Sequence, residues 1–154
     1  REQDLTRPIR HEDETCTTTW RIDQHYPMEK NSQQYPGAEW LSEGVLTPID
    51  FYALPYRCFY SKDVRNMFMA GRNISVTHIA LGSTRVMRTC GMIGEVVGMA
   101  ASVCMKRNAL PRDIYTTYFA DLQELMRKGT GRTDVPYTQF YHQVDRTGHQ
   151  AEDR

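Results

Sequence analysis

The spacing of glycines within one predicted helix, residues 91–107, constrains the fold of this chain more than any other sequence feature. Gly91, Gly94 and Gly98 recur at helical spacing and Ala101 continues the series, so one face of the helix has almost no side chains. A glycine costs roughly 1 kcal/mol relative to alanine inside a helix. We therefore expect a close neighbour on this face, which is either a tightly packed sheet or a flat or phosphorylated cofactor.

Residues that favour helix boundaries mark the ends of two helical segments. At the start of the first helix, Thr89, Cys90 and Gly91 would present free backbone N–H groups and the positive end of the helix dipole. A second helix is predicted from Asp113, a favourable N-cap residue, to Gly129, a typical helix stop. The two helices would form a helical hairpin.

Extended segments precede these helices. Residues that are β-branched or aromatic predict strands over residues 16–26, 45–54 and 56–60, and a composition rich in Pro, Gly, Asn and Ser predicts a loop over residues 27–42. The apolar run of residues 66–71 ends on glycine and is typical of a strand buried on both faces of a parallel sheet. The end of such a strand is expected to form a ligand edge.

Charge and cysteine content limit the partners of the chain. The 19 Lys and Arg residues balance the 19 Asp and Glu residues, so we expect no nucleic acid and no membrane as electrostatic partners. No apolar run approaches the roughly 20 residues of a membrane helix. The four cysteines, at positions 16, 58, 90 and 104, are too far apart in sequence for a zinc or iron–sulfur ligand set. We therefore predict buried free thiols and no metal site.

Five segments of the sequence together carry a family resemblance. They are residues 20–27 (WRIDQHYP), 55–60 (PYRCFY), 69–75 (MAGRNIS), 81–89 (LGSTRVMRT) and 91–98 (GMIGEVVG). Over roughly residues 16–128, the chain closely resembles the C-terminal part of bacterial FAD-dependent oxidoreductases of the heterodisulfide-reductase-A-like group.

The resemblance implies an α/β fold, or an α+β fold for the segment by itself. This fold would be the C-terminal portion of a Rossmann-like FAD-binding domain, with part of a β-rich substrate domain and a C-terminal helical hairpin. Residues 1–54 would belong to the substrate-domain side and residues 55–128 to the FAD-binding domain. Residues 129–154 would form a polar tail, which we expect to be partly disordered.

The family's Gly-x-Gly-x-x-Gly fingerprint is missing from the sequence. The chain also opens on Arg1 without the pattern of a signal peptide. We therefore expect a segment of a longer flavoprotein or a truncated product, which holds FAD poorly without the missing N-terminal dinucleotide-binding part.

A first set of residues would bind FAD according to the resemblance. Gly71 permits a close backbone approach, and the Arg72 guanidinium can pair with phosphate oxygens, with an ordinary surface arginine as the alternative. The N–H groups of residues 89–93 would stabilise negative charge on the reduced flavin. The full set is Gly71, Arg72, Asn73, Gly82, Ser83, Thr89, Cys90, Gly91, Met92 and Ile93.

A second set would act on a small-molecule organic substrate. Asp23 and His25 are two residues apart on a predicted strand, and thus on one face, where they could transfer a proton. The alternative for them is a solvated edge pair. The resemblance places His78 and Arg85 in a loop above the flavin, where Arg85 would bind an anionic or hydroxylated substrate or else form a structural salt bridge.

Two functions from different classes follow. The first is an FAD-dependent oxidoreductase that transfers a hydride or electrons between an organic substrate and the flavin, with this chain inactive by itself. The second is a catalytically silent interaction or structural fragment. A third, a carbohydrate-binding module that uses Trp20, Trp40 and the tyrosines, rests on aromatic residues alone.

Overall fold

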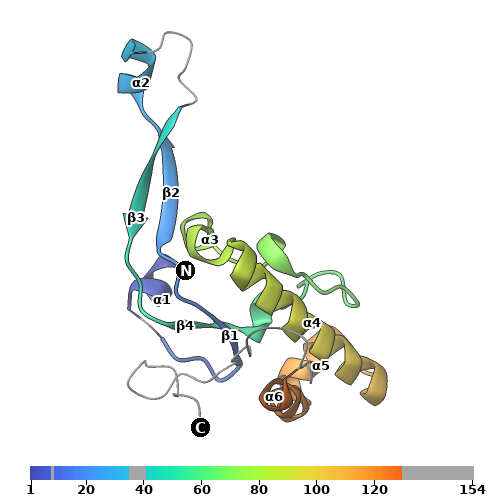
Figure 1. Cartoon of the computed structure of the whole chain (residues 1–154). Helices are drawn as coiled ribbons and strands as arrows, with labels where there is room; N and C mark the ends of the chain where they lie inside the picture. The colour runs from blue at the N-terminus through green and yellow to red at the C-terminus, as the bar shows by residue number, and fades with distance from the viewer. Residues whose placement is uncertain (8, 35–40, 130–154) are drawn as a thin grey trace, which may run out of the picture.

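The computed structural model describes residues 1–7, 9–34 and 41–129 and shows a mixed α and β structure (Figure 1). Its elements, in chain order, are α1 (Glu2–Thr6), β1 (Glu14–Thr18), β2 (Ile22–Pro27), α2 (Glu29–Gln34), β3 (Ser42–Thr47), β4 (Tyr52–Pro55), the 3₁₀ turns η1 (Tyr56–Phe59) and η2 (Gly71–Asn73), α3 (His78–Thr84), α4 (Met87–Arg107), α5 (Pro111–Thr116) and α6 (Phe119–Lys128). The predicted polar tail lies, from residue 130 onward, outside the described residues.

The strands form two antiparallel ribbons. β1 pairs with β4, and β2 pairs with β3 in a register that places Asp23 opposite Leu46 and His25 opposite Gly44. The strand prediction over residues 16–26 is therefore confirmed as two strands, which separate where the chain passes from one ribbon to the other. The prediction over residues 45–54 also becomes two strands.

The β2–β3 ribbon projects from the rest of the structure and carries α2 at its far end (Figure 1). The loop prediction over residues 27–42 is therefore wrong for α2 itself, although residues 35–40 lie outside the described part. α3 lies beside β2, on the side of the ribbon where α4 lies (Figure 1).

Two predicted strands are absent. Residues 56–59 form the 3₁₀ turn η1, and the run over residues 66–71 makes only one antiparallel bridge, between Phe68 and Tyr60. Met67 is exposed, so this run is not buried on both faces. The residues described contain no parallel strand pair. A short apolar run cannot by itself distinguish a buried strand from a turn that packs one side against a core.

The helix predicted over residues 91–107 is confirmed and begins four residues earlier, as α4. Its C-cap, Asn108, has a φ of 50°, which ends the helix in the left-handed region. The second predicted helix is split into α5 and α6. The N-cap of α5 is Leu110 and not Asp113, which is the third residue of the helix; the Asp113 carboxylate accepts from the Leu110 N–H at 2.8 Å. Gly129 ends α6 as predicted.

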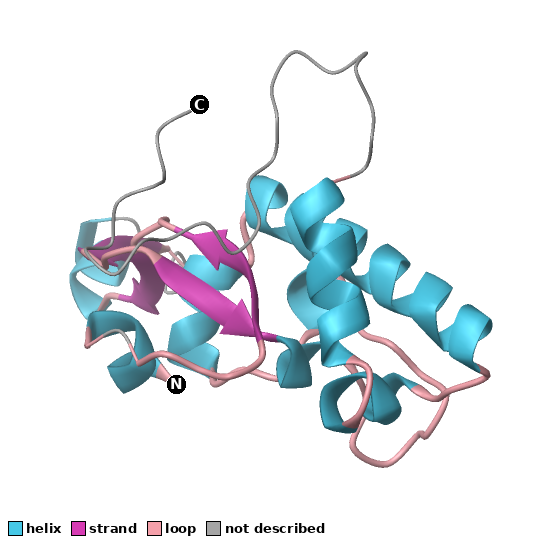
Figure 2. Cartoon of the chain, turned by 90° about the horizontal axis from the view of Figure 1, so that it is seen from below, coloured by secondary structure: helices cyan, strands magenta, loops and turns pink. Residues whose placement is uncertain are grey.

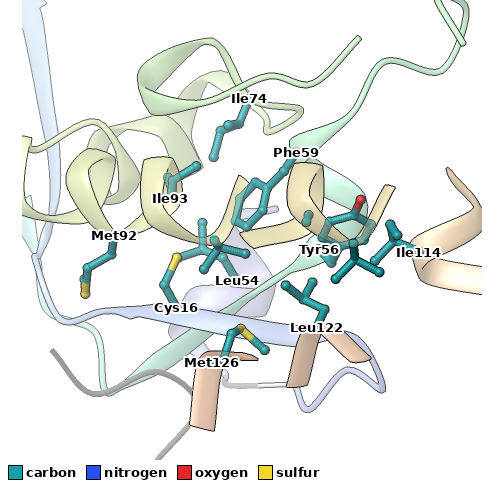
Figure 3. Packing of buried hydrophobic residues seen from close by; sticks show 13 residues of the cluster. Cys16, Leu54, Tyr56, Phe59, Ile74, Met92, Ile93, Ile114, Leu122 and Met126 are labelled. Atoms are coloured by element: carbon teal, nitrogen blue, oxygen red, sulfur yellow. The ribbon is translucent and has the colours of Figure 1, made fainter. Parts of the chain in front are cut away.

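The main core joins the helices to the β1–β4 ribbon (Figure 3). Tyr56 and Phe59 of η1 are fully buried in it, and the Tyr56 hydroxyl donates to the Pro111 carbonyl at 2.7 Å. Cys16 and Leu54 pack in the same cluster. Figure 2 shows this arrangement from below, with a group of helices beside the paired strands. The division at residues 54 and 55 remains a prediction.

Among the described residues, no single helix combines the length with the apolar composition that a membrane span requires. α3 and α4 reach them only as a pair, and a bend of 91° separates the two helices.

Candidate functional site

A close contact between a helix and a strand backbone occurs at Gly82, in α3. A Cβ atom at Gly82 would lie 2.7 Å from the backbone oxygen of Asp23 and 2.9 Å from its backbone nitrogen. The backbone of Asp23 therefore lies directly against α3 at this residue. α3 can lie against β2 only because residue 82 has no side chain.

The predicted close neighbour of the α4 glycines is absent among the described residues. A Cβ at Gly91, Gly94 or Gly98 would meet no atom within 4 Å, because α4 faces the strands and α6 with its larger apolar residues instead. Tight sheet contact is therefore the wrong explanation for these glycines. The face that they form is open, and the methionines at its two ends, Met87 and Met105, are 92% and 86% exposed.

The structure brings together three of the four residues proposed to act on a substrate. Asp23 Oδ1 lies 3.1 Å from His25 Nε2, and Asp23 Oδ2 lies 3.2 Å from Arg85 Nη2. Arg85 is the C-cap of α3 and stands two residues before α4 begins. The His25 side chain is 53% exposed, so solvent and small molecules can reach it.

His78 is not part of this cluster. It is the exposed first residue of α3, whereas Arg85 caps the other end of the helix. Arg85 follows His78 by seven positions, a helical rise of about 10 Å.

Buried hydroxyl groups connect β1 to the bend between α3 and α4. The Ser83 hydroxyl donates to the Trp20 carbonyl at 2.7 Å, and the Thr18 hydroxyl donates to the Ser83 carbonyl at 3.1 Å. The Thr89 hydroxyl donates to Thr18 Oγ1 at 3.4 Å. The side chains of Ser83 and Thr89, predicted to bind the cofactor, thus hold the bend in place. Sequence reasoning missed Thr18.

The start of α4 differs from the prediction. The Cys90 N–H is not free, because the helix begins at Met87 and this group donates to the Val86 carbonyl at 2.9 Å. The N–H groups of the first turn belong to residues 87–89. Met92 and Ile93 lie beyond that turn, and their side chains are buried in the core (Figure 3).

The 3₁₀ turn η2 lies against this helix start. Gly71 has a φ of +80°, which is the reason a glycine is required there, and its hypothetical Cβ would be 4.0 Å from the Cβ of Cys90. Arg72 and Asn73 are exposed. Burial raises the pKa of the Cys90 thiol, and the Arg72 charge lowers it. Residues 71–73 and 90, far apart in sequence, therefore form one edge.

This edge has features that suit part of a flavin cofactor. The exposed Arg72 guanidinium can pair with an anionic group, and the N–H groups at residues 87–89 favour negative charge. The open face at Gly91 and Gly94 leaves room for a flat group. The residues described contain no group of three or more His, Cys, Asp or Glu side chains that could hold a metal ion.

All four cysteines are free thiols, as predicted, but only Cys16 is fully buried. Burial raises the pKa of Cys16 to about 12 and that of Cys58 to about 11.

Because the thiolate is the reactive form, a raised pKa slows alkylation at neutral pH. We expect iodoacetamide to modify Cys104 before Cys58, and Cys16 last, when the sites are followed by peptide mass spectrometry. In denaturant the order should disappear. Equal rates for Cys16 and Cys104 in the native protein would contradict the buried position of Cys16.

Comparison with models of known protein families identifies a family for this chain. A family model described as FAD dependent oxidoreductase matches residues 1–126. No curated protein and no solved structure matches the chain.

Proposed function

Because the chain belongs to the FAD-dependent oxidoreductase family, we propose that it takes part in hydride or electron transfer between FAD and a small organic substrate. FAD is the cofactor of this family, and when bound it supplies the acceptor for the hydride or electrons. The observation that carries the proposal is the edge formed by Gly71, Arg72 and the start of α4. It combines a cation, helix N–H groups and an open glycine face.

On this proposal residues 55–128 are the C-terminal portion of a Rossmann-like FAD-binding domain of the bacterial heterodisulfide-reductase-A-like group, and residues 1–54 belong to its substrate-domain side. The sequence lacks the Gly-x-Gly-x-x-Gly loop that cradles a pyrophosphate. A separate N-terminal dinucleotide-binding part would supply that loop. Its partner surface would be the open face of α4, where Gly91, Gly94 and Gly98 allow close contact.

The substrate would bind beside the α3–α4 bend. Here His25 is the exposed group that can accept or give a proton, and Asp23 Oδ1 lies 3.1 Å from its Nε2. Arg85 is paired with Asp23, so its first role is structural. Gly82, Ser83 and Thr89 hold this region in place around the bend.

Replacing Arg72 by alanine should weaken retention of FAD, because it removes a charge-assisted contact with an anionic group of the cofactor. FAD absorbance would be measured after gel filtration of the protein expressed from its complete coding sequence. Arg127→Ala is the matched control, since it removes the same charge from the end of α6, where Arg127 pairs with Glu124. Equal flavin content in the two variants would remove Arg72 from the cofactor site.

The alternative function is a catalytically silent interaction or structural fragment. The exposed, apolar face of α4 favours it, because such a face serves packing against another chain segment as well as it serves a cofactor. The complete protein distinguishes the two functions. Protein that stays colourless after addition of FAD supports the silent fragment.

A further inference from the structure

A cavity of about 90 Å³ borders the face of α3 that is turned away from Asp23. Ala80 and Thr84 line it and are four residues apart, hence on one face of the helix, whereas Gly82 contacts the Asp23 backbone from the opposite face. The other walls come from α1, β4, η1 and the segment that follows η2. The cavity is therefore separate from the substrate site proposed above.

Most of the cavity wall is apolar. Leu5 of α1 and Leu54 of β4 are each 1% exposed, and the side chains of Val76 and Ala80 complete this part of the wall. Ser75, which also lines the cavity, is exposed, so the space reaches the surface of the protein. An apolar cavity of roughly 150 Å³ holds a benzene molecule, and on that scale this one has room for about four non-hydrogen atoms.

Thr84 contributes a hydrogen-bonding group that lacks a partner. The residue is 2% exposed, and its Oγ1 atom is buried with no hydrogen bond to any residue that the structure describes. A buried hydroxyl without a hydrogen bond costs free energy. A molecule in the cavity that Thr84 lines would supply the missing bond.

The other polar groups of the wall favour an uncharged occupant. Burial raises the pKa of the Cys58 thiol to about 11 and also raises the pKa of the Tyr52 hydroxyl, so both are neutral at pH 7. The Tyr52 hydroxyl lies 3.1 Å from His11 Nε2 in a hydrogen bond, and the Asp4 carboxylate accepts from the Arg1 nitrogen at 2.7 Å. An ion would lose its hydration against this wall, whereas a neutral molecule would not.

We infer that this cavity binds a small uncharged organic molecule of the short-chain alcohol or ketone class, with about four non-hydrogen atoms. Its oxygen forms a hydrogen bond with Thr84 Oγ1, and its short apolar body lies against Leu54, Val76 and Ala80. The site uses none of the residues proposed to contact FAD or to transfer a proton. It is therefore a second binding site, on the far side of α3.

The test is a titration of the 154-residue chain with 2-propanol, followed through the methyl signals of the ¹³C-labelled protein by NMR. The methyl signals of Leu54, Val76 and Ala80 should shift together and saturate, with a Kd roughly in the millimolar range for a ligand of this size. The exposed Met105 methyl, at the far end of α4, reports the general effect of the solvent and should not saturate. Unshifted cavity methyl signals would mean that the cavity holds water only, which would overturn the inference.

Two variants test the two parts of the site. Thr84→Val keeps the shape of the side chain and removes the hydroxyl, so it should raise the Kd by about five- to tenfold, the effect of one hydrogen bond. Its Tm without ligand should equal or exceed that of the parent, because a buried hydroxyl without a partner is gone. Thr116→Val is the matched control on the exposed surface of α5 and should leave the Kd unchanged.

Ala80→Leu fills the cavity and should abolish the shifts. An unchanged Kd in Thr84→Val, or binding that persists in Ala80→Leu, would overturn the inference. Thr84→Val decides the question even if the larger side chain at position 80 prevents folding. The titration needs no flavin, so its failure would leave the proposed oxidoreductase function untouched, and its success would not depend on FAD.

Discussion

Replacing Gly82 by alanine should lower the free energy of unfolding by about 3 kcal/mol, the upper end of the usual cost of overpacking. The added Cβ would lie within 2.9 Å of the backbone nitrogen and oxygen of Asp23. Backbone atoms in a paired strand cannot move aside as a flexible side chain can, so α3 must shift away from β2. Urea unfolding followed by circular dichroism would measure the loss.

Gly98→Ala is the matched control for this substitution when both variants are measured on the 154-residue chain alone, without the proposed N-terminal part. A Cβ at Gly98 meets nothing within 4 Å, and alanine is the better helix former, so this variant should gain up to about 1 kcal/mol. The two glycines are thus expected to respond with opposite signs. A Gly82→Ala variant as stable as the parent would show that α3 does not pack on the backbone of Asp23.

Replacing Asp13 by alanine should cost about 3 kcal/mol. The Asp13 carboxylate is buried and accepts from the Arg57 backbone N–H at 2.9 Å and from the guanidinium Nε and Nη2 at 3.0 Å each. Breaking a buried ion pair typically costs 3–5 kcal/mol, and the lower end applies because the Arg57 side chain is 42% exposed. The same unfolding measurement applies.

Asp121→Ala provides the comparison on the surface. Asp121 pairs with Arg107 at 2.6 Å, but the Arg107 and Asp121 side chains are 44% and 35% exposed, so water screens this pair and Asp121→Ala should destabilise the protein clearly less than Asp13→Ala does. If Asp13→Ala lowered the free energy of unfolding no more than Asp121→Ala does, then the Asp13–Arg57 pair would not stabilise the region around η1.

The helical part of the fold could be predicted because its pattern is local. Apolar residues at helical spacing and the terminal Gly129 locate α4 and the end of α6. The strand prediction over residues 66–71 is wrong because an apolar composition fits a strand as well as a turn. In the structure this run pairs only at Phe68, through one bridge. Nothing in the run itself carries that information.

The candidate site was partly visible in the sequence. The two-residue spacing of Asp23 and His25 predicted a shared face, and the structure places their side chains in contact. Asp13 and Thr18 were missed, because each acquires its role from a residue that the fold brings close. Gly82 was included for a cofactor, but its measurable role is to let α3 reach β2.

The bend between α3 and α4 also has a kinetic consequence. The hydrogen bonds that fix it join residues far apart in the chain, with separations of 62 for Asp23 and Arg85, 65 for Thr18 and Ser83, and 71 for Thr18 and Thr89. Helices and the β2–β3 hairpin need only local contacts and can form early, whereas contacts of high sequence separation require closure of a long loop. The cluster of Asp23, His25 and Arg85 is therefore expected to be completed late in folding, after the elements that carry its residues.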